Sequence, residues 1–233
     1  MSPSSGPSRR AVEIPLDQRS LLADLAVPAG SSAIVLFAHG SGSGRTSPRN
    51  RSVAEDLERR GIGTLLLDLL TREEAEEDER TMKYRFQIPL LADRMDAAID
   101  WVTREPGLRS LGIGLYGAST GGAAALISAA RRPDRVQALV LRGARSDLAR
   151  EWVPRVKAPT LLIVGSRDPV ILEISRETSR LLASPHSTVV VPGATHLFEE
   201  PGALETVSEN AVDWFARWLT RVPTTHTRIP PTT

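Results

Sequence analysis

The sequence predicts a single domain of the α/β class, built on a mostly parallel sheet with helices on both faces. Short, almost continuous apolar runs recur along the chain, and longer segments with helical spacing of apolar residues separate them. The alternation of strand and helix favours parallel pairing with right-handed crossovers. The 233 residues are 41% hydrophobic and 24% charged, which suits one buried core.

Six apolar runs are expected to form buried strands. Continuous rather than alternating apolar residues are typical of parallel strands that are covered on both faces. The runs are AIVLFA (33–38), IGTLLLD (62–68), LGIGLYG (111–117), VQALVLR (136–142), PTLLIVG (159–165) and STVVVPG (187–193). Residues 12–16 and 21–27 precede them with no helix in between, so we expect an antiparallel hairpin at one edge of the sheet.

Helical spacing of apolar residues predicts the intervening helices. They are residues 48–60, 87–104, 120–131, 170–182 and 203–220. Residues 143–158 leave room for only one ordinary connection between strands, so no separate cap domain is expected. Both ends are rich in proline, serine or threonine, which predicts a single domain over 11–221 between loose segments at 1–10 and 222–233.

Composition argues against several classes of protein. The 29 Lys and Arg residues balance 28 Asp and Glu residues, which disfavours a surface that coats nucleic acid. The absence of cysteine removes disulfides, thiolate metal sites and a cysteine nucleophile. No apolar run reaches the roughly 18 residues of a membrane span, and the first residues do not resemble a secretory signal. We therefore expect a cytoplasmic monomer or homodimer with neither a membrane nor a nucleic-acid partner.

A glycine-rich loop, FAHGSGSGRTSPRN, follows the first long strand. Its glycines, Gly40, Gly42 and Gly44, do not fit G-x-G-x-x-G because position 45 is Arg, and no Gly-Lys-Ser/Thr follows. Nucleotide binding is therefore disfavoured. Two interpretations remain open: a flexible turn before a helix, or a turn whose backbone N–H groups face a developing negative charge.

The strongest catalytic signal is the G-x-S-x-G pattern at 117–121, centred on Ser119. It lies between the strand LGIGLYG and the small-residue helix GGAAALISAA. This is the setting of a nucleophile elbow, a sharp strand-to-helix turn that exposes the serine hydroxyl. Ser119 is therefore the candidate nucleophile.

A serine nucleophile needs a base to take its proton, and the chain has four histidines. His196 follows the strand STVVVPG and precedes the last helix, which puts it at the same carboxyl edge as Ser119. His39 is expected to position the glycine-rich loop, His186 lies in a polar turn, and His226 lies in the loose tail. His196 is therefore the candidate base.

The base in turn needs a carboxylate that holds its tautomer. Asp168 follows the strand PTLLIVG and also emerges at the carboxyl edge. The alternative, Asp147, has the competing interpretation of a helix N-cap, which Asp168 shares because Pro169 opens the next helix. The order Ser119, Asp168, His196 favours Asp168.

At this point the chain resembles the α/β-hydrolase fold, and within it the dienelactone-hydrolase-like group. The resemblance runs from about Leu22 to Leu219. It is carried most specifically by HGSGSGRTSPRN, YGASTGGAAAL, APTLLIVGSRDPVI and VPGATHLFEEPG. It implies a catalytic triad of Ser119, Asp168 and His196.

The resemblance also implies an oxyanion hole formed by the backbone N–H groups of Ser41 and Thr120, with no metal and no cofactor. The founding dienelactone hydrolases use a cysteine nucleophile where this chain has serine. The expected activity is serine-dependent hydrolysis of a small ester or lactone. The alternatives are acyl transfer or cofactor-free perhydrolysis on the same fold, and, in another class, a binding protein without catalysis.

Charged segments lie near the predicted site. The run REEAEEDER (72–80) is expected to be a solvated loop or helix face. Arg85 follows this run, and Arg142 and Arg145 leave another strand end at the same edge. They either bind an acidic substrate or pair with the acidic run. Arg85 and Arg142, together with Gly40 and Gly42, are the candidate substrate contacts.

Overall fold

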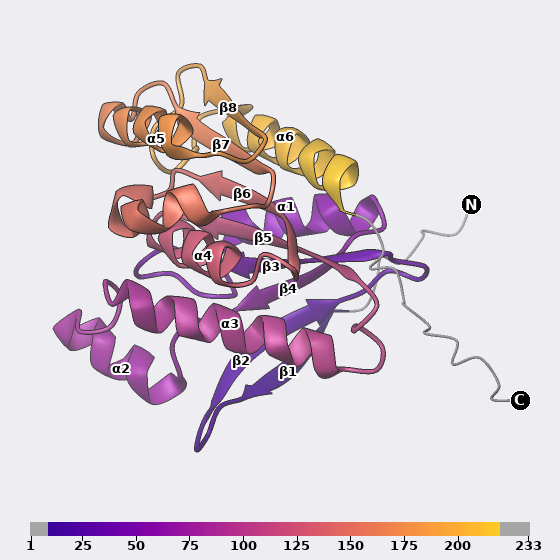
Figure 1. The fold of residues 1–233 in the computed structure, drawn as a ribbon. Helices are drawn as coiled ribbons and strands as arrows, with labels where there is room; N and C mark the ends of the chain where they lie inside the picture. The colour runs from indigo at the N-terminus through magenta and orange to yellow at the C-terminus, as the bar shows by residue number, and fades with distance from the viewer. Residues whose placement is uncertain (1–8, 220–233) are drawn as a thin grey trace, which may run out of the picture.

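The computed structural model describes residues 9–219, and an eight-stranded sheet forms its centre (Figure 1). The strands are β1 (Arg10–Pro15), β2 (Ser20–Ala26), β3 (Ala33–Ala38), β4 (Gly63–Leu67), β5 (Gly112–Ala118), β6 (Val136–Arg142), β7 (Thr160–Gly165) and β8 (His186–Val191). Their order in the sheet is β1-β2-β4-β3-β5-β6-β7-β8. The β1–β2 and β2–β4 pairs are antiparallel, and all the others are parallel.

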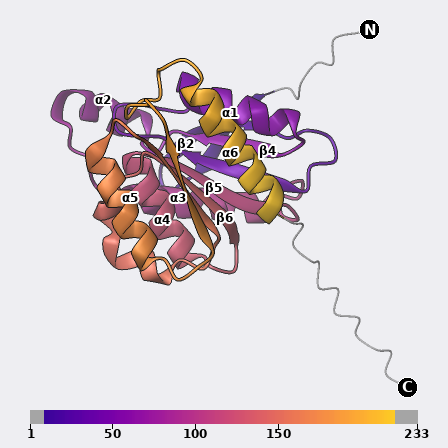
Figure 2. The same cartoon turned by 90° about the horizontal axis from the view of Figure 1, so that it is seen from above.

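Helices cover both faces of this sheet. They are α1 (Pro48–Arg59), α2 (Arg72–Thr81), α3 (Ile88–Arg104), α4 (Thr120–Arg131), the 3₁₀ helix η1 (Ser146–Arg155), α5 (Pro169–Leu181) and α6 (Ala203–Trp218). Figure 2 shows α1 and α6 on one face and α3, α4 and α5 on the other. The predicted α/β class, the mostly parallel sheet and the N-terminal hairpin are confirmed.

The continuous apolar runs supply two cores at once. Along β3, Ile34 and Leu36 pack in the core beneath α3 and α4. Val35 and Phe37 point the other way, into the core beneath α1 and α6. Successive side chains of a strand face opposite sides, so a strand covered on both faces must be apolar throughout.

The acidic run 72–80 differs from the prediction. It lies in α2, and the N-cap residue Thr71 forms a capping box with Glu74, in which each side chain accepts from the other residue's backbone N–H. Glu74 and Asp78 are buried rather than solvated. They are four residues apart and so share one helix face, which turns toward the protein. The other acidic residues of the run are exposed or half-buried, as predicted for a solvated helix face.

Two further features are local. Residues 143–158, the connection in which no cap domain is expected, contain 3₁₀ turns, with Pro154 inside η1. The segments predicted to be loose lie mostly outside the described residues, and β1 begins at Arg10, within the first of them. None of the helices in residues 9–219 has the length and apolar character needed to cross a membrane.

Strand register brings the ends of five strands to one edge of the sheet. Ala38 on β3 pairs with Gly117 on β5, and Ala118 pairs with Arg142 on β6. At the far side, Gly165 on β7 pairs with Val191 on β8. The loops that follow these strands therefore meet at the carboxyl edge, where ligands bind in open α/β sheets.

Phe215 should be a main contributor to the α6 interface. Its ring is fully buried and occupies the space that the absence of a side chain at Gly114 leaves open. We expect Phe215→Ala to lower the free energy of unfolding by about 3–5 kcal/mol, measured by urea denaturation. Glu209→Ala, at an exposed position on the same helix, should change it by less than about 0.5 kcal/mol. Equal effects of the two substitutions would contradict this packing.

Candidate active site

Ser119 occupies the sharp turn between β5 and α4, with φ 51° and ψ −121°. A non-glycine residue held at such angles costs on the order of 1–3 kcal/mol, so neighbouring bonds must hold it. Its N–H donates to the Arg142 carbonyl over 3.2 Å. Its own carbonyl accepts from the N–H groups of Gly122 and Arg145, each over 3.0 Å. This strand–turn–helix geometry is the one that the sequence predicts at Ser119.

Glycines allow the close packing around this turn. A Cβ at Gly117 would lie only 2.6 Å from the Cα of Gly122, where β5 meets α4. A Cβ at Gly121 would run into the backbone carbonyl of His39 at the end of β3. The first turn of α4 therefore sits directly against the glycine-rich loop.

Asp168, His196 and Ser119 form a hydrogen-bonded chain. The Nδ1 atom of His196 lies 2.6 Å from Oδ2 of Asp168, and its Nε2 lies 3.4 Å from Oγ of Ser119. A carboxylate only accepts, so Nδ1 carries the proton and Nε2 is free to accept the serine proton. The second Asp168 oxygen accepts from the Ile171 N–H over 3.4 Å. Asp168 therefore caps α5 and holds the histidine at the same time.

The alternative residues lie elsewhere. Asp147 forms a two-pronged ion pair with Arg145, at 2.8 and 2.7 Å, and this pair raises the pKa of the Arg145 guanidinium. Arg145 is therefore not an open anion site. His186 bonds the Ser184 carbonyl at the start of β8, and position 226 is outside the described residues.

His39 is buried beneath the glycine-rich loop. Its Nε2 accepts from the Leu69 N–H over 3.0 Å, so Nδ1 carries the proton and donates it to the Gly40 carbonyl over 2.9 Å. Burial lowers the pKa of His39, against the opposing effects of the Gly40 bond and the Asp68 carboxylate. The ring therefore supports the loop, which is the position that the sequence predicts, and its two bonds require the neutral form.

The glycine-rich loop lies against the nucleophile. A Cβ at Gly40 would be 3.1 Å from Cβ of Ser119, and Gly42 has φ +69°. The N–H of Thr120, at the first position of α4, has no partner within the helix. The N–H of Ser41 donates to no group of residues 9–219. Both predicted oxyanion donors are thus unoccupied by other acceptors.

A cavity of about 160 Å³ borders Ser119. We call it the serine cavity; its lining includes Gly40, Ser41, Asn50, Ser119, Arg142 and His196. The Arg142 side chain is 93% buried, with 7% exposed, and its Nε has no hydrogen-bond partner in residues 9–219. Its guanidinium lies 5.6 Å from the ring of Phe198.

Two polar residues near Arg142 were not predicted from the sequence. Asn50 is buried in the serine cavity, and its Oδ1 has no partner among the described residues. The hydroxyl of Tyr116 is likewise buried without a hydrogen-bond partner among the described residues. Burial raises the pKa of Tyr116, and the charge of Arg142 opposes this. Both residues lie within stretches that carry the family resemblance, but nothing in those stretches predicts that their polar atoms are buried without a partner, so only the fold reveals this.

A second cavity, of about 130 Å³, lies on the other side of the glycine-rich loop. We call it the α2 cavity; its lining includes Ser41, Gly42, Asp78, Arg85, Leu91 and Thr120. Arg85 donates from Nε to the Asp78 carboxylate and from Nη2 to the Asp78 carbonyl, each over 2.7 Å. Burial would raise the pKa of Asp78, but hydrogen bonds from Tyr84 and Arg85 lower it overall. Arg85 therefore reaches the cavity as one half of an ion pair.

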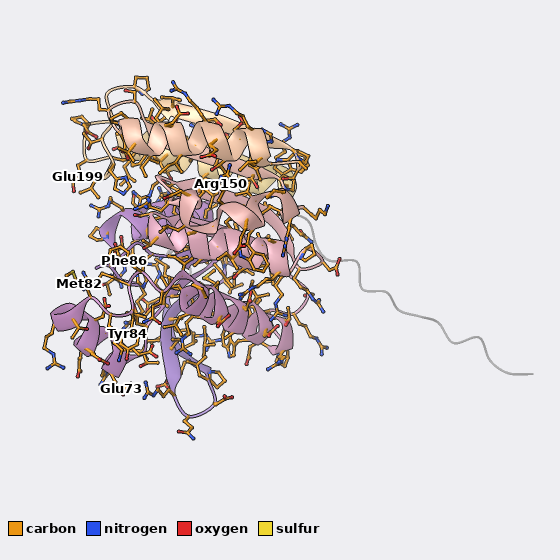
Figure 3. All side chains as sticks on the ribbon, turned by 60° about the vertical axis from the view of Figure 1, so that its left-hand side comes forward. Glu73, Met82, Tyr84, Phe86, Arg150 and Glu199 are labelled. Atoms are coloured by element: carbon orange, nitrogen blue, oxygen red, sulfur yellow. The ribbon has the colours of Figure 1, made fainter. Side chains whose placement is uncertain are left out.

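Exposed apolar side chains stand on loops at this edge. Met82 and Phe86, on the connection between α2 and α3, are 61% and 56% exposed. Figure 3 shows both on the same side of the molecule as Glu199, from the loop that carries His196.

No group of three or more His, Cys, Asp or Glu side chains within 9–219 is placed to hold a metal ion.

Comparisons with known proteins agree with the fold. A family model described as an alpha/beta hydrolase domain matches residues 31–222. A solved dienelactone hydrolase from Anabaena variabilis is 50% identical and superposes with a TM-score of 0.91, covering 92% of this chain and 100% of that one. Est1E from Butyrivibrio proteoclasticus shares the fold, with 19% identity, a TM-score of 0.75 and coverage of 91% and 98%.

A Mycobacterium tuberculosis protein is similar over most of this chain. It carries the provisional name phosphoribosyl transferase Rv0571c and is 51% identical over 191 residues. Those residues are 82% of this chain and 42% of the mycobacterial protein. The chain thus spans about two fifths of the length of the curated relatives it matches.

Proposed function

The chain belongs to the α/β-hydrolase family, and we propose that it is a serine hydrolase that cleaves a small carboxylic ester or lactone through an acyl-enzyme intermediate. The observation that carries the proposal is the hydrogen-bonded chain from Asp168 through His196 to Ser119. The similarity to a solved dienelactone hydrolase supports the hydrolase class.

In the proposed mechanism, Ser119 Oγ attacks the substrate carbonyl while Nε2 of His196 accepts the hydroxyl proton. Asp168 keeps the imidazole in the tautomer that can accept this proton and stabilises the imidazolium that forms. His196 then gives the proton to the departing alkoxide. In the second half-reaction His196 takes a proton from water as the water oxygen attacks the acyl group. When the bond between Ser119 Oγ and the acyl carbon breaks and the acid leaves, His196 returns that proton to Oγ.

The negative charge of the tetrahedral intermediate needs donors that are already in place. The free N–H groups of Ser41 and Thr120 are proposed to supply them, with the N-terminus of α4 adding its positive dipole end. Gly40 permits the close approach of this loop to Ser119. The 3.4 Å separation of His196 and Ser119 is within the range expected before substrate binds.

Arg142 is the candidate that best supports an acidic substrate. A buried guanidinium without a carboxylate partner is costly unless an anion neutralises it. The serine cavity gives it access to a group bound at Ser119. We propose that the substrate carries an anionic group on the acyl side of the scissile bond. Arg85, already paired with Asp78, is proposed to border the α2 cavity together with Gly42.

Acyl transfer and perhydrolysis would use the same acyl-enzyme and differ only in the acceptor, so product analysis in water, alcohol and peroxide distinguishes them. A binding protein without catalysis would form no acyl-enzyme. The name of the mycobacterial relatives describes proteins of which this chain spans only 42%, and their activity is not carried over to it.

Replacement of Ser119 tests the nucleophile. Ser119→Ala should lower kcat for p-nitrophenyl acetate by about 10⁶-fold, because only the oxyanion hole and binding remain. A fluorophosphonate probe should label the wild type and leave the variant unlabelled. Equal labelling of the wild type and the variant would contradict the proposed function.

Replacement of the two aspartates tests the acid. Asp168→Asn should lower kcat by roughly 10⁴-fold, because an amide donates to Nδ1 and stabilises the wrong tautomer. Asp147→Asn is the matched control, since it disturbs only the pair with Arg145, and it should keep kcat within about threefold, as expected of a surface ion pair. A larger loss in Asp147→Asn would move the acid to that position.

Matched esters test the role of Arg142. Mono-p-nitrophenyl glutarate carries a free carboxylate, whereas p-nitrophenyl butyrate is neutral. Arg142→Gln should raise KM for the anionic ester about tenfold or more, the loss expected for one charge-assisted hydrogen bond. KM for the neutral ester should change by less than threefold. Equal increases in KM for both esters would show that Arg142 stabilises the site and does not recognise the charge of the substrate.

A further inference from the structure

The glycine-rich loop is tied at both ends to two consecutive residues that follow β4. At its start, Nε2 of His39 accepts from the Leu69 N–H over 3.0 Å. At its end, Oδ1 of Asp68 accepts from the Arg45 N–H over 2.7 Å, and Oδ2 accepts from the Arg45 guanidinium over 2.6 Å. The loop therefore cannot shift without breaking one of these bonds.

Between the two ties, the loop has neighbours on both sides. Gly40 faces Ser119, since a Cβ there would lie 3.1 Å from Cβ of Ser119. Gly44 faces Asp68, since a Cβ there would lie 2.8 Å from the Asp68 carboxylate. Ser41, with its free N–H, stands between these two contacts. The position of the Ser41 N–H therefore depends on the bonds between Asp68 and Arg45, which fix the end of the loop next to β4.

We propose that Asp68 is a positioning residue that holds the Ser41 N–H in place for the oxyanion. The inference rests on the proposed function, because it needs an oxyanion at Ser119. Removing an oxyanion donor costs about 10²–10³-fold in kcat, and a donor gives this stabilisation only if it is already oriented. Asp68 acts on the loop's backbone and lies outside both the serine cavity and the α2 cavity.

Asp24, on β2, provides a matched comparison. Its Oδ1 accepts from Nε of Arg45 over 3.2 Å, and its Oδ2 accepts from Arg51 over 3.0 Å. Asp24 and Asp68 therefore bind the same guanidinium. Only Asp68 also binds the loop's backbone. If the charge network were merely structural, the loss of either acid would have similar consequences.

The test compares Asp68→Ala, Asp68→Asn and Asp24→Asn in the full chain, with p-nitrophenyl acetate as substrate. Asp68→Ala should lower kcat by about 10²-fold, the scale of one oxyanion donor, with KM within threefold. Affinity for a boronic acid, which forms a tetrahedral adduct with a serine nucleophile, should fall in parallel. Asp68→Asn keeps an amide oxygen for the Arg45 N–H but loses the ionic bond to the Arg45 guanidinium, so its kcat should lie threefold to tenfold below that of the wild type. Asp24→Asn should keep kcat within threefold.

Several results would overturn the proposal. They are an Asp68→Ala variant with kcat within threefold of wild type, a loss that appears in KM rather than kcat, and an equal loss in Asp24→Asn. If Asp68→Ala does not fold, Asp68→Asn decides: a threefold to tenfold drop in kcat and in boronate affinity supports positioning, and a change in Tm alone refutes it. Full activity of Ser119→Ala would instead refute the proposed function, so the two failures are distinguishable.

Discussion

The site depends on the tight backbone reversal at Ser119. The strand β5 and the helix α4 can meet at that angle only because Gly117 and Gly121 carry no side chain. The Ser119 N–H donates to the Arg142 carbonyl on β6, and the Arg145 N–H, in the loop after β6, donates to the Ser119 carbonyl. These two bonds hold the reversal in place. The unfavourable backbone angles of Ser119 are thus held by bonds to β6, to the loop after β6 and to the first turn of α4, which is how a fold sustains such angles.

Much of this arrangement could be predicted from the sequence. Ser119, Asp168 and His196 each follow a strongly apolar run, and parallel strands bring such positions to one edge without knowledge of any side-chain contact. Helix and strand bounds were close for the same reason, since both faces of the sheet are covered and the apolar pattern is continuous. The roles assigned to these residues remain predictions.

The charged residues were less predictable. Six acids in the run 72–80 look alike in sequence, yet Glu74 and Asp78 are buried while their neighbours are not. Their partners, Arg94 and Arg85, come from the following helix and loop, and only the packing of α2 selects them. Arg142 is the reverse case. It ends an apolar strand, and the sequence left open whether it binds an acidic substrate or pairs with the acidic run; the fold buries it without a carboxylate partner among the described residues.

The contact between His196 and Ser119 joins residues 77 positions apart, across the intervening strands β6 and β7. Such a contact closes late in folding, because a long loop must lose its entropy before the contact contributes. During refolding, near-native helix content would therefore return before the histidine reaches the serine. Labelling of Ser119 by a fluorophosphonate would then report when β7, β8 and α6 dock onto the rest of the sheet.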